Sequence, residues 1–484
     1  MPTLTPLDFQ VLLPQIILVA WACALLLVSV FARKAGPGLM PGLTALGLLV
    51  TGIFVAFQFS LEADAFGGML VADGFSAFLS LLLIMGGLLT IALSTNYMQR
   101  MGWAKPEYYV LMLFSISGMM LMGSASDLML VFLALELLSI PLYILAAIAR
   151  PDERSEEAGL KYFLLGAFAS GFLLYGVALV YGATGSTGFS DIVAALGSGG
   201  AQPLYLTVGA GLILVGLGFK VAAVPFHMWT PDVYQGSPTS VTAFMALGAK
   251  AAGFAALLRV LLVLFPGISD QLTPVLSGLA VATLLVGNLL AIRQSNVKRM
   301  LAYSSISHAG FVLMAVSAYG SDAARFDLVA SVLFYLLAFA FASFGSWAVV
   351  MALEHAGGKG LEFADYAGLG RKAPGLAAAM VVFMLSFTGV PPTLGFAGKF
   401  YLFRTVLEAG QVGLALVGVL TSLISAYYYL RLVVVMYMQP GTPKVHQDKS
   451  LAWTAGATAV ATVVLFLFAQ PLFGWAAQAL LKIF

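Results

Sequence analysis

The chain has 484 residues, of which 61% are hydrophobic and 9% are charged, and its net charge is +2. Ordinary soluble domains carry about 25% charged residues, so this composition excludes that class. The apolar stretches are continuous and do not alternate with polar residues, which excludes a membrane β-barrel and predicts an all-α integral membrane protein.

Apolar runs bounded by charge, glycine and proline predict about fourteen transmembrane helices. Asp8 precedes the first run and no basic residue does, so this run is predicted to stay in the membrane and not to be a cleaved signal. The predicted spans are residues 11–31, 41–60, 75–96, 107–124, 127–148, 157–182, 204–235, 239–264, 274–292, 300–318, 327–353, 374–408, 411–437 and 452–480.

Basic residues are distributed unevenly among the loops of this plan. The even-numbered loops hold Arg325 alone. Since cytoplasmic loops carry an excess of Lys and Arg, we expect the odd-numbered loops in the cytoplasm and both termini on the opposite side of the membrane. The basic residues of the odd-numbered loops are Arg33, Lys34, Arg100, Lys105, Arg150, Arg154, Arg293, Lys298, Arg299, Lys359, Arg371, Lys372, Lys444 and Lys449.

Two predicted spans are interrupted. The seventh contains Pro225 and Pro231, and the twelfth contains Gly389, Pro391 and Pro392. Proline removes a backbone donor and disrupts the preceding turn, so such breaks occur at membrane depth only where protein or a water-filled cavity satisfies the freed groups. Interrupted spans in corresponding halves are typical of the ion sites of transporters.

The two breaks lie five spans apart, and an odd repeat length inverts the topology of the second copy. We therefore expect two inverted five-helix repeats, spans four to eight and nine to thirteen. Within one membrane domain, the predicted parts are an N-terminal three-helix segment (1–105), a first repeat (106–265), a second repeat (270–438) and a C-terminal helix (450–484).

Charged residues inside the spans are the candidates for function. A charge at the bilayer centre costs about 2.5–3.5 kcal/mol on insertion scales, so such residues usually face a polar interior. Glu136 lies nine residues after Asp127 and fourteen before Arg150, which places it near mid-membrane. It is interpreted as a proton-relay carboxylate or as the counter-charge of a lysine on another helix; the alternative is a purely structural ion pair.

Three lysines are predicted at similar depth: Lys220 before the first break, Lys250 among small residues of span eight, and Lys399 after the second break. Burial favours the neutral form of a lysine and a nearby carboxylate favours the charged form, so these lysines can switch between the two. We expect Lys250 to be a relay lysine and Lys399 a terminal proton site. Alternatively, the Lys220 side chain extends to the membrane surface, which requires a position closer to that surface than the one predicted.

Four further basic residues lie within spans but nearer their ends. Lys161 follows the acidic start of span six, so it either joins the relay or pairs locally. Arg259, Arg404 and Arg431 are interpreted either as interface anchors or as relay residues.

His227 and Asp232 lie beside the first predicted break, and His308 lies in a polar span. His308 and His227 are candidates for proton transfer, because histidine titrates near neutral pH; alternatively they hydrogen-bond to freed backbone groups. Asp232 directly follows Pro231 and is predicted to cap the second half of the broken span.

The sequence contains no nucleotide-binding loop, dinucleotide fingerprint or metal-ligand cluster. A lone cysteine, Cys23, cannot hold an iron–sulfur cluster or a structural zinc ion. We therefore expect the chain itself to bind no nucleotide, flavin, redox metal or nucleic acid, and to receive energy from an ion gradient or from neighbouring subunits.

Five segments together resemble one family: ELLSIPLYIL, EEAGLKYFLLGAFAS, GFKVAAVPFHMWTPDVYQGSPT, KRMLAYSSISHAG and GVPPTLGFAGKFY. They are similar to the antiporter-like subunits of respiratory complex I, a bacterial NADH:quinone oxidoreductase, over roughly residues 100–435. The similarity is greatest to the N-type subunits, because of TPDVYQGSPT after span seven, a lysine at position 399, and no long lateral helix after span fourteen.

The resemblance implies a coupled pair of Glu136 and Lys220, and outward proton pumping driven by electron transfer from NADH to quinone. It places NADH, FMN, iron–sulfur clusters and quinone in the partner membrane and peripheral subunits, not in this chain. A subunit of a cation/proton antiporter without a redox partner, and a structural spacer that conducts nothing, remain alternatives. The proton-translocating residues implied are Glu136, Lys220, Lys250, Lys399, His308 and Lys161, with His227 as an accessory.

Overall fold

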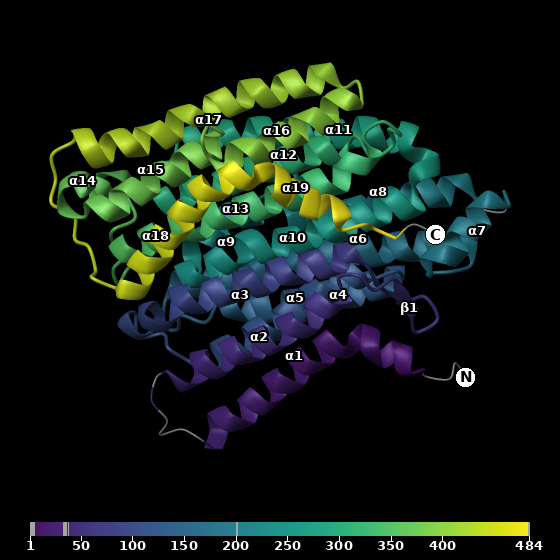
Figure 1. Cartoon of the computed structure of the whole chain (residues 1–484), viewed down its shortest axis with the longest axis horizontal. Coiled ribbons are helices and arrows are strands. Elements are labelled where there is room, and N and C mark those ends of the chain that lie inside the picture. Colours follow the sequence, from purple (N-terminus) through teal and green to yellow (C-terminus); the bar gives the residue numbers. More distant parts are fainter. Residues whose placement is uncertain (1–4, 32–35, 37, 200–201, 483–484) are drawn as a thin grey trace.

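The structure is a computed structural model of the chain and describes residues 5–31, 36, 38–199 and 202–482. Its helices run side by side along the long axis of the molecule (Figure 1). The elements are α1 (Pro6–Phe31), α2 (Leu39–Gln58), β1 (Ala63–Ala65), β2 (Leu70–Ala72), α3 (Gly74–Arg100), α4 (Glu107–Ser124), α5 (Leu128–Ala146), α6 (Glu153–Thr184), α7 (Phe189–Gly197), α8 (Pro203–Val221), α9 (Trp229–Gly236), α10 (Thr239–Leu264), η1 (Pro266–Ile268), α11 (Ser269–Ile292), α12 (Val297–Val316), α13 (Arg325–Leu353), η2 (Phe363–Tyr366), α14 (Leu369–Lys372), α15 (Pro374–Thr388), α16 (Leu394–Glu408), α17 (Val412–Met438), α18 (Lys449–Val464), η3 (Leu465–Phe468) and α19 (Ala469–Gln478).

In the described residues, eleven helical segments are long and apolar enough to cross a membrane. Every predicted span coincides with a helix or with consecutive short helices of the structure. The helix α4, the polar helix α12 and the pair α15–α16 fall outside the eleven. An all-α polytopic membrane protein is therefore confirmed, and the number fourteen stays a prediction.

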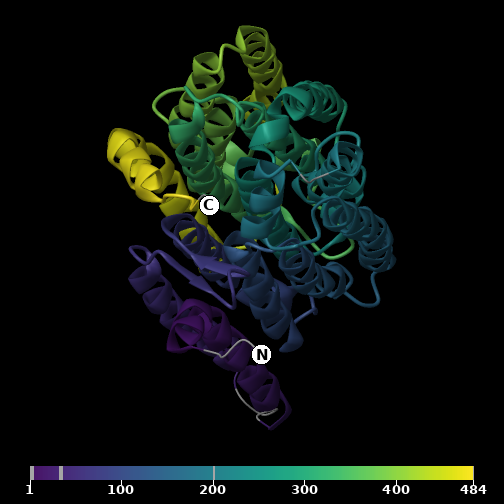
Figure 2. The same ribbon diagram turned by 90° about the vertical axis from the view of Figure 1, so that its right-hand side faces the viewer.

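The helices α10 and α13 form the centre of the bundle. The apolar window of α10 is 100% buried and that of α13 is 89% buried, whereas those of α1 and α2 are 33% buried. Seen along the helices, the N-terminal helices lie at one edge and the last helices lie against a flank (Figure 2). Charged side chains on elements packed against α10 or α13 are thus the ones most fully removed from lipid and water.

Both predicted helix breaks are present, at residues 222–228 between α8 and α9 and at 389–393 between α15 and α16. Each upstream helix ends in a left-handed residue, Ala222 with φ of 61° and Gly389 with φ of 88°. The expectation that Pro231 disrupts a helix is wrong, because this residue lies in the first turn of α9. Proline is tolerated there, since the first turn has no intrahelical acceptor for its missing N–H.

The odd-numbered loops gather at one end of the bundle and the even-numbered loops at the other. At the first end, Tyr97 Oη donates a 2.9 Å hydrogen bond to Glu354. At the second end, Thr187 Oγ1 donates a 2.7 Å hydrogen bond to Asp127. In Figure 1, α14 marks the first end, and α7 and β1 mark the second. Basic residues of the described odd-numbered loops therefore share one end, as the alternation of charge predicts.

Three elements of the second end, two strands and a helix, were not predicted. The strands β1 and β2 pair in antiparallel fashion, with Asp64 opposite Val71, and α7 occupies the loop between α6 and α8. All three are short and lie outside the long apolar runs, so the periodicity of the spans gives no signal for them. Arg33 and Lys34, two of the basic residues counted in the odd-numbered loops, lie outside the described residues.

Candidate functional site

Lys220 lies in the last turn of α8, directly before the first break, and is 1% exposed. Its ammonium lies 5.2, 5.4 and 5.5 Å from the ring centres of Tyr162, Tyr143 and Phe219. Its Nζ has no hydrogen-bond partner among the described residues. Aromatic faces, which attract cations, are therefore the principal stabilising neighbours of this charge.

Glu136 projects from α5 and its carboxylate accepts a hydrogen bond from Ser170 Oγ of α6. Because the Lys220 ammonium has no hydrogen-bond partner in the described part of the chain, the expected Glu136–Lys220 pair is not in direct contact. Tyr143 lies on the same helix as Glu136, and its ring faces Lys220. The helix α5 thus carries both a carboxylate and an aromatic face of this half of the site.

Lys250 lies on α10 and is 4% exposed. Its Nζ donates hydrogen bonds of 2.6 Å to both the backbone carbonyl and the Oγ of Ser305 on α12. A Cβ on the neighbouring Gly248 would lie 2.8 Å from Met119 Sδ, so the small residues around Lys250 allow close helix packing, as predicted. The ring of Tyr234 lies 5.9 Å from the ammonium.

His308 lies one turn beyond Ser305 on α12 and is 6% exposed. Its Nδ1 and the Tyr335 hydroxyl are 2.5 Å apart, and its Nε2 and the Tyr429 hydroxyl are 3.1 Å apart. Ser305, His308 and Phe311 are spaced three residues apart and share one face of the helix. Both ring nitrogens therefore lie in a hydrogen-bonded environment suited to proton exchange.

Lys399 lies on α16, after the second break, and is 4% exposed. Its Nζ donates to the Thr388 carbonyl at 2.9 Å and to Ser422 Oγ at 2.7 Å, and lies 4.3 Å from the Phe311 ring centre. Thr388 ends α15, so this lysine satisfies a carbonyl freed by the break, at the negative end of the helix dipole. Gly389 permits the approach, since a Cβ there would lie 2.9 Å from Lys399 Cδ.

Most of the residues predicted to carry protons thus form one buried row. The stem of Lys220 packs against α10 one turn from Lys250, and Lys250 and His308 line the same narrow cavity. His308 and Lys399 lie 6.3 and 4.3 Å from the ring centre of Phe311. Side chains arranged in such a row can exchange protons where water molecules bridge them. Within the described residues, no group of three or more His, Cys, Asp or Glu side chains could hold a metal ion.

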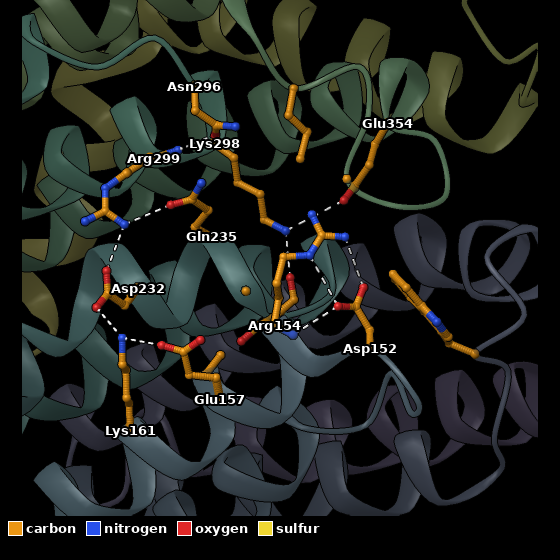
Figure 3. A pocket seen from close by; sticks show the side chains of 16 residues that line it. Asp152, Arg154, Glu157, Lys161, Asp232, Gln235, Asn296, Lys298, Arg299 and Glu354 are labelled. Carbon is orange, nitrogen blue, oxygen red and sulfur yellow. Dashed lines mark hydrogen bonds and ion pairs between the residues drawn. The ribbon is translucent and has the colours of Figure 1, made fainter.

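Lys161 lies apart from this row, in a polar pocket of about 260 Å³ at the end where the odd-numbered loops meet (Figure 3). Its Nζ is 2.9 Å from Asp232 and 2.6 Å from Glu157, and Asp232 is 2.8 Å from Arg299. The predicted cap is wrong: α9 begins after Met228 without a side-chain cap. Asp232 instead binds cations from α6 and α12, which approach α9 from two sides.

Two buried charges of the same pocket were missed. Glu354 is 3% exposed and accepts hydrogen bonds from Tyr97 Oη at 2.9 Å and Thr239 Oγ1 at 2.6 Å. Lys298 is 1% exposed; its Nζ is 3.8 Å from the Glu354 carboxylate and donates to the Ser237 carbonyl at 2.6 Å. Lys298 was predicted in an odd-numbered loop and lies instead, buried, in the first turn of α12. No local sequence signal indicates this burial, which arises because α3, α10, α12 and α13 meet there.

The remaining candidates lie outside the row. Arg259 is 1% exposed and forms a 3.0 Å ion pair with Asp73. Arg404 pairs with acidic side chains at the surface, and Arg431 donates to carbonyls at the end of α11. His227 lies in the first break, half-buried, and its Nδ1 has no hydrogen-bond partner among the described residues. Structural pairing thus accounts for the three arginines.

Comparison with known proteins identifies the family of the chain. The family described as "NADH:quinone oxidoreductase/Mrp antiporter, TM" matches residues 125–425. The chain is 46% identical over 436 residues to NADH-quinone oxidoreductase subunit N of Trichlorobacter lovleyi, covering 90% of the chain and 88% of the relative. It is 44% identical over 484 residues to the subunit N of Chloroflexus aggregans, covering 99% and 98%.

A solved structure is similar as well. One chain of respiratory complex I from Thermus thermophilus with bound Aureothin is 36% identical with a TM-score of 0.81, and the match covers 96% of this chain and 99% of that one. The family match extends over more than half of the sequence, and the relatives align along nearly their full length. The chain therefore belongs to the NADH:quinone oxidoreductase/Mrp antiporter transmembrane family.

Proposed function

We propose that the chain is a proton-translocating membrane subunit of NADH:quinone oxidoreductase, which couples electron transfer in other subunits to outward proton movement. The observation that carries this proposal is the buried row of Lys220, Lys250, His308 and Lys399 beside two broken helices. Buried lysines are costly in a membrane bundle, so function is the best reason to keep three of them. The subunits N of two bacteria, similar over nearly their whole length, support the assignment.

The first step of the proposed mechanism takes place at Glu136 and Lys220. The carboxylate now accepts a hydrogen bond from Ser170, and the ammonium lies over aromatic rings. Electron transfer in neighbouring subunits changes the electric field at Glu136, which then exchanges Ser170 for Lys220. A nearby carboxylate favours the charged lysine, and separation of the pair favours the neutral one, so each cycle loads and releases a proton.

The later steps follow the buried row. Lys250 takes up the proton, His308 passes it along α12, and Lys399 releases it on the far side. Serine and tyrosine hydroxyls line this path, among them Ser305 and Tyr335, which contact Lys250 and His308. Lys161 is proposed as a relay residue on the entry side, with His227 as an accessory.

The organisation that we propose is fourteen spans with two inverted repeats, residues 106–265 and 270–438, and both termini in the periplasm. The odd-numbered loops, which carry most of the basic loop residues, gather at the end of the bundle marked by α14 in Figure 1, which supports this orientation. NADH, FMN, iron–sulfur clusters and quinone are proposed to be held by partner subunits. The chain contributes proton transfer and no redox step.

The test is proton pumping by the assembled complex in membrane vesicles. Lys220→Ala and Glu136→Gln should lower the number of protons pumped per NADH oxidised, because each removes one partner of the loading step. Lys372→Ala, at an exposed position of α14, is the matched control and should pump normally. Full pumping by both variants, with the complex still assembled, would overturn the proposal.

A second candidate function is that of a subunit in a cation/proton antiporter, because the matching family also includes Mrp antiporters. This function predicts exchange of protons for another cation without NADH or quinone. Purification from native membranes distinguishes the two. Recovery with NADH:quinone oxidoreductase subunits favours the first function, and recovery with sodium-dependent exchange in their absence favours the second.

A further inference from the structure

Three aromatic side chains connect the surroundings of Lys220 with those of Lys250. Tyr162 of α6 stacks on Trp229 of α9, with ring centres 4.5 Å apart and planes 8° apart. Trp229 meets Tyr234 edge-on, at 6.0 Å. All three side chains are at most 1% exposed. We call this group the aromatic wall.

Each outer member of the aromatic wall faces one lysine. The Lys220 ammonium lies 5.2 Å from the ring centre of Tyr162. The Lys250 ammonium lies 5.9 Å from that of Tyr234. The order along the wall is therefore lysine, tyrosine, tryptophan, tyrosine, lysine. A proton that moves between the two lysines by this route must pass the indole.

The polar atoms of the aromatic wall differ in their partners. Trp229 Nε1 donates a 2.9 Å hydrogen bond to the Phe219 carbonyl, which fixes the indole in place. The hydroxyls of Tyr162 and Tyr234 are buried without a hydrogen-bond partner among the described residues. Buried hydroxyls nearly always bind protein or ordered water. These two hydroxyls are thus suited to bind water next to each lysine.

We propose that the hydroxyls of Tyr162 and Tyr234, linked by water past Trp229, carry the proton from Lys220 to Lys250; this inference rests on the proposed function. Each tyrosine oxygen accepts a proton from the Lys220 side as its own O–H proton leaves toward Lys250. One O–H bond forms while another breaks, so both tyrosines are neutral before and after transfer. Lys220 becomes a neutral amine and Lys250 becomes an ammonium.

The outer face of α9 holds the aromatic wall in position. Asp232, on this face, binds Lys161 of α6 at 2.9 Å and Arg299 of α12 at 2.8 Å (Figure 3). Because Tyr162 lies next to Lys161 on α6, this ion pair holds α9 against the helix that supplies the other half of the stack. Asp232 is therefore a positioning residue for Trp229 and not itself a member of the proton path.

The test uses Tyr162→Phe, Tyr234→Phe and the double variant in the assembled complex, with proton translocation and NADH oxidation measured together in vesicles. Each change removes a hydroxyl and keeps the ring and its stacking. Lys250→Ala abolishes one part of the translocation. This part should fall about a hundredfold or more in the double variant, since a positioned proton-transfer group typically contributes about 10²–10⁴-fold. Tyr181→Phe on α6, where Tyr181 is 54% exposed, is the matched control and should pump normally.

The outcomes separate this inference from the proposed function. If the double variant pumps normally while Lys250→Ala does not, the tyrosine path is overturned and the proposed function stands. If Lys250→Ala also pumps normally, both are overturned. Should the double variant fail to assemble, the single variants decide in the same way.

Asp232 provides an independent measurement. Asp232→Asn weakens both ion pairs, so the stack of Tyr162 on Trp229 should loosen. The proton translocation that depends on Lys250 should then fall more than twofold. Asp232→Glu retains the charge and should restore pumping. A loss in Asp232→Asn that Asp232→Glu does not relieve would overturn the positioning role.

Discussion

Lys220 and Lys399 both lie beside a broken helix and are both almost fully buried, at 1% and 4% exposure, yet their ammonium groups have different surroundings. Lys399 donates to two oxygens, those of Thr388 and Ser422. Lys220 has no hydrogen-bond partner among the described residues and lies over three aromatic rings.

The difference follows from which side of the break carries the lysine. Lys399 follows its break, and its side chain reaches back to the carbonyl end of α15. Lys220 precedes its break, in the last turn of α8, and projects sideways toward α5 and α6. The second site therefore satisfies a charged lysine locally. The first site offers a charged lysine aromatic faces alone, and an oxygen partner only when Glu136 approaches.

The largest expected effect comes from replacing each lysine with methionine. Both Lys220→Met and Lys399→Met should lose most proton pumping, because each removes a proton carrier. Their stabilities should differ: Lys399→Met costs about 1–3 kcal/mol, since it removes two hydrogen bonds from a charged donor, although Ser422 Oγ still donates to the Thr388 carbonyl. Lys220→Met removes a buried charge without an oxygen partner and should be neutral or stabilising. Melting temperatures of the purified complex test this contrast, and equal shifts for both variants would contradict it.

A smaller effect is expected at the second break. Gly389→Ala forces a non-glycine residue to adopt φ of 88°, at a cost of about 1–2 kcal/mol. The added Cβ, 2.9 Å from Lys399 Cδ, should also displace the lysine and reduce pumping. Gly182→Ala on α6, where a Cβ meets no atom within 4 Å, is the control for a glycine without either constraint. Unchanged pumping and melting temperature in Gly389→Ala would show that Lys399 tolerates displacement.

Removing one hydroxyl beside each lysine should show the same difference between the two sites, with smaller changes in stability. Ser422→Ala removes one of the two acceptors of Lys399 and should cost about 1 kcal/mol. Tyr143→Phe, beside Lys220, removes a hydroxyl that has no hydrogen-bond partner among the described residues. The stability of this variant should therefore change by less than that of Ser422→Ala. The melting temperatures of both variants provide the measurement. A greater loss in Tyr143→Phe would mean that its hydroxyl binds an ordered water.

The smallest effect is expected for Ala222→Gly at the first break. Glycine relieves the cost of φ of 61°, which is about 1 kcal/mol, but it loses a fully buried methyl group worth about 0.8 kcal/mol. The two terms nearly cancel, so the melting temperature should hardly move. A clear rise in stability would show that backbone strain dominates at this break.

The breaks show how far sequence reasoning extends. Pro225 and the glycine–proline run at 389–392 were sufficient to predict two interrupted helices, because proline and glycine act locally. The same reasoning failed at Pro231, which lies in the first turn of α9, and at Asp232, which pairs with two distant cations. Which side chain meets Asp232 depends on the packing of α6 and α12 around α9.

Burial was predicted well within long apolar spans and poorly at their ends. Lys250 and Lys399 are surrounded by apolar sequence, so their burial could be expected from composition alone. Lys298 lies among charged residues of a loop sequence and is nevertheless 1% exposed. Its environment is built by Glu354 and Tyr97, which are far away along the chain.

Hydropathy and helix-breaking residues along the chain were enough to predict the membrane class, the long helices, the two breaks and the burial of Lys220, Lys250 and Lys399. These features depend on hydropathy and on backbone chemistry, which act over a few neighbouring residues. Only the tertiary structure decided that Lys220 lies over aromatic rings while Lys399 binds oxygens, and that Tyr162, Trp229 and Tyr234 connect Lys220 with Lys250. Those contacts join different helices, and the physical reason is that packing, not local sequence, sets which faces meet.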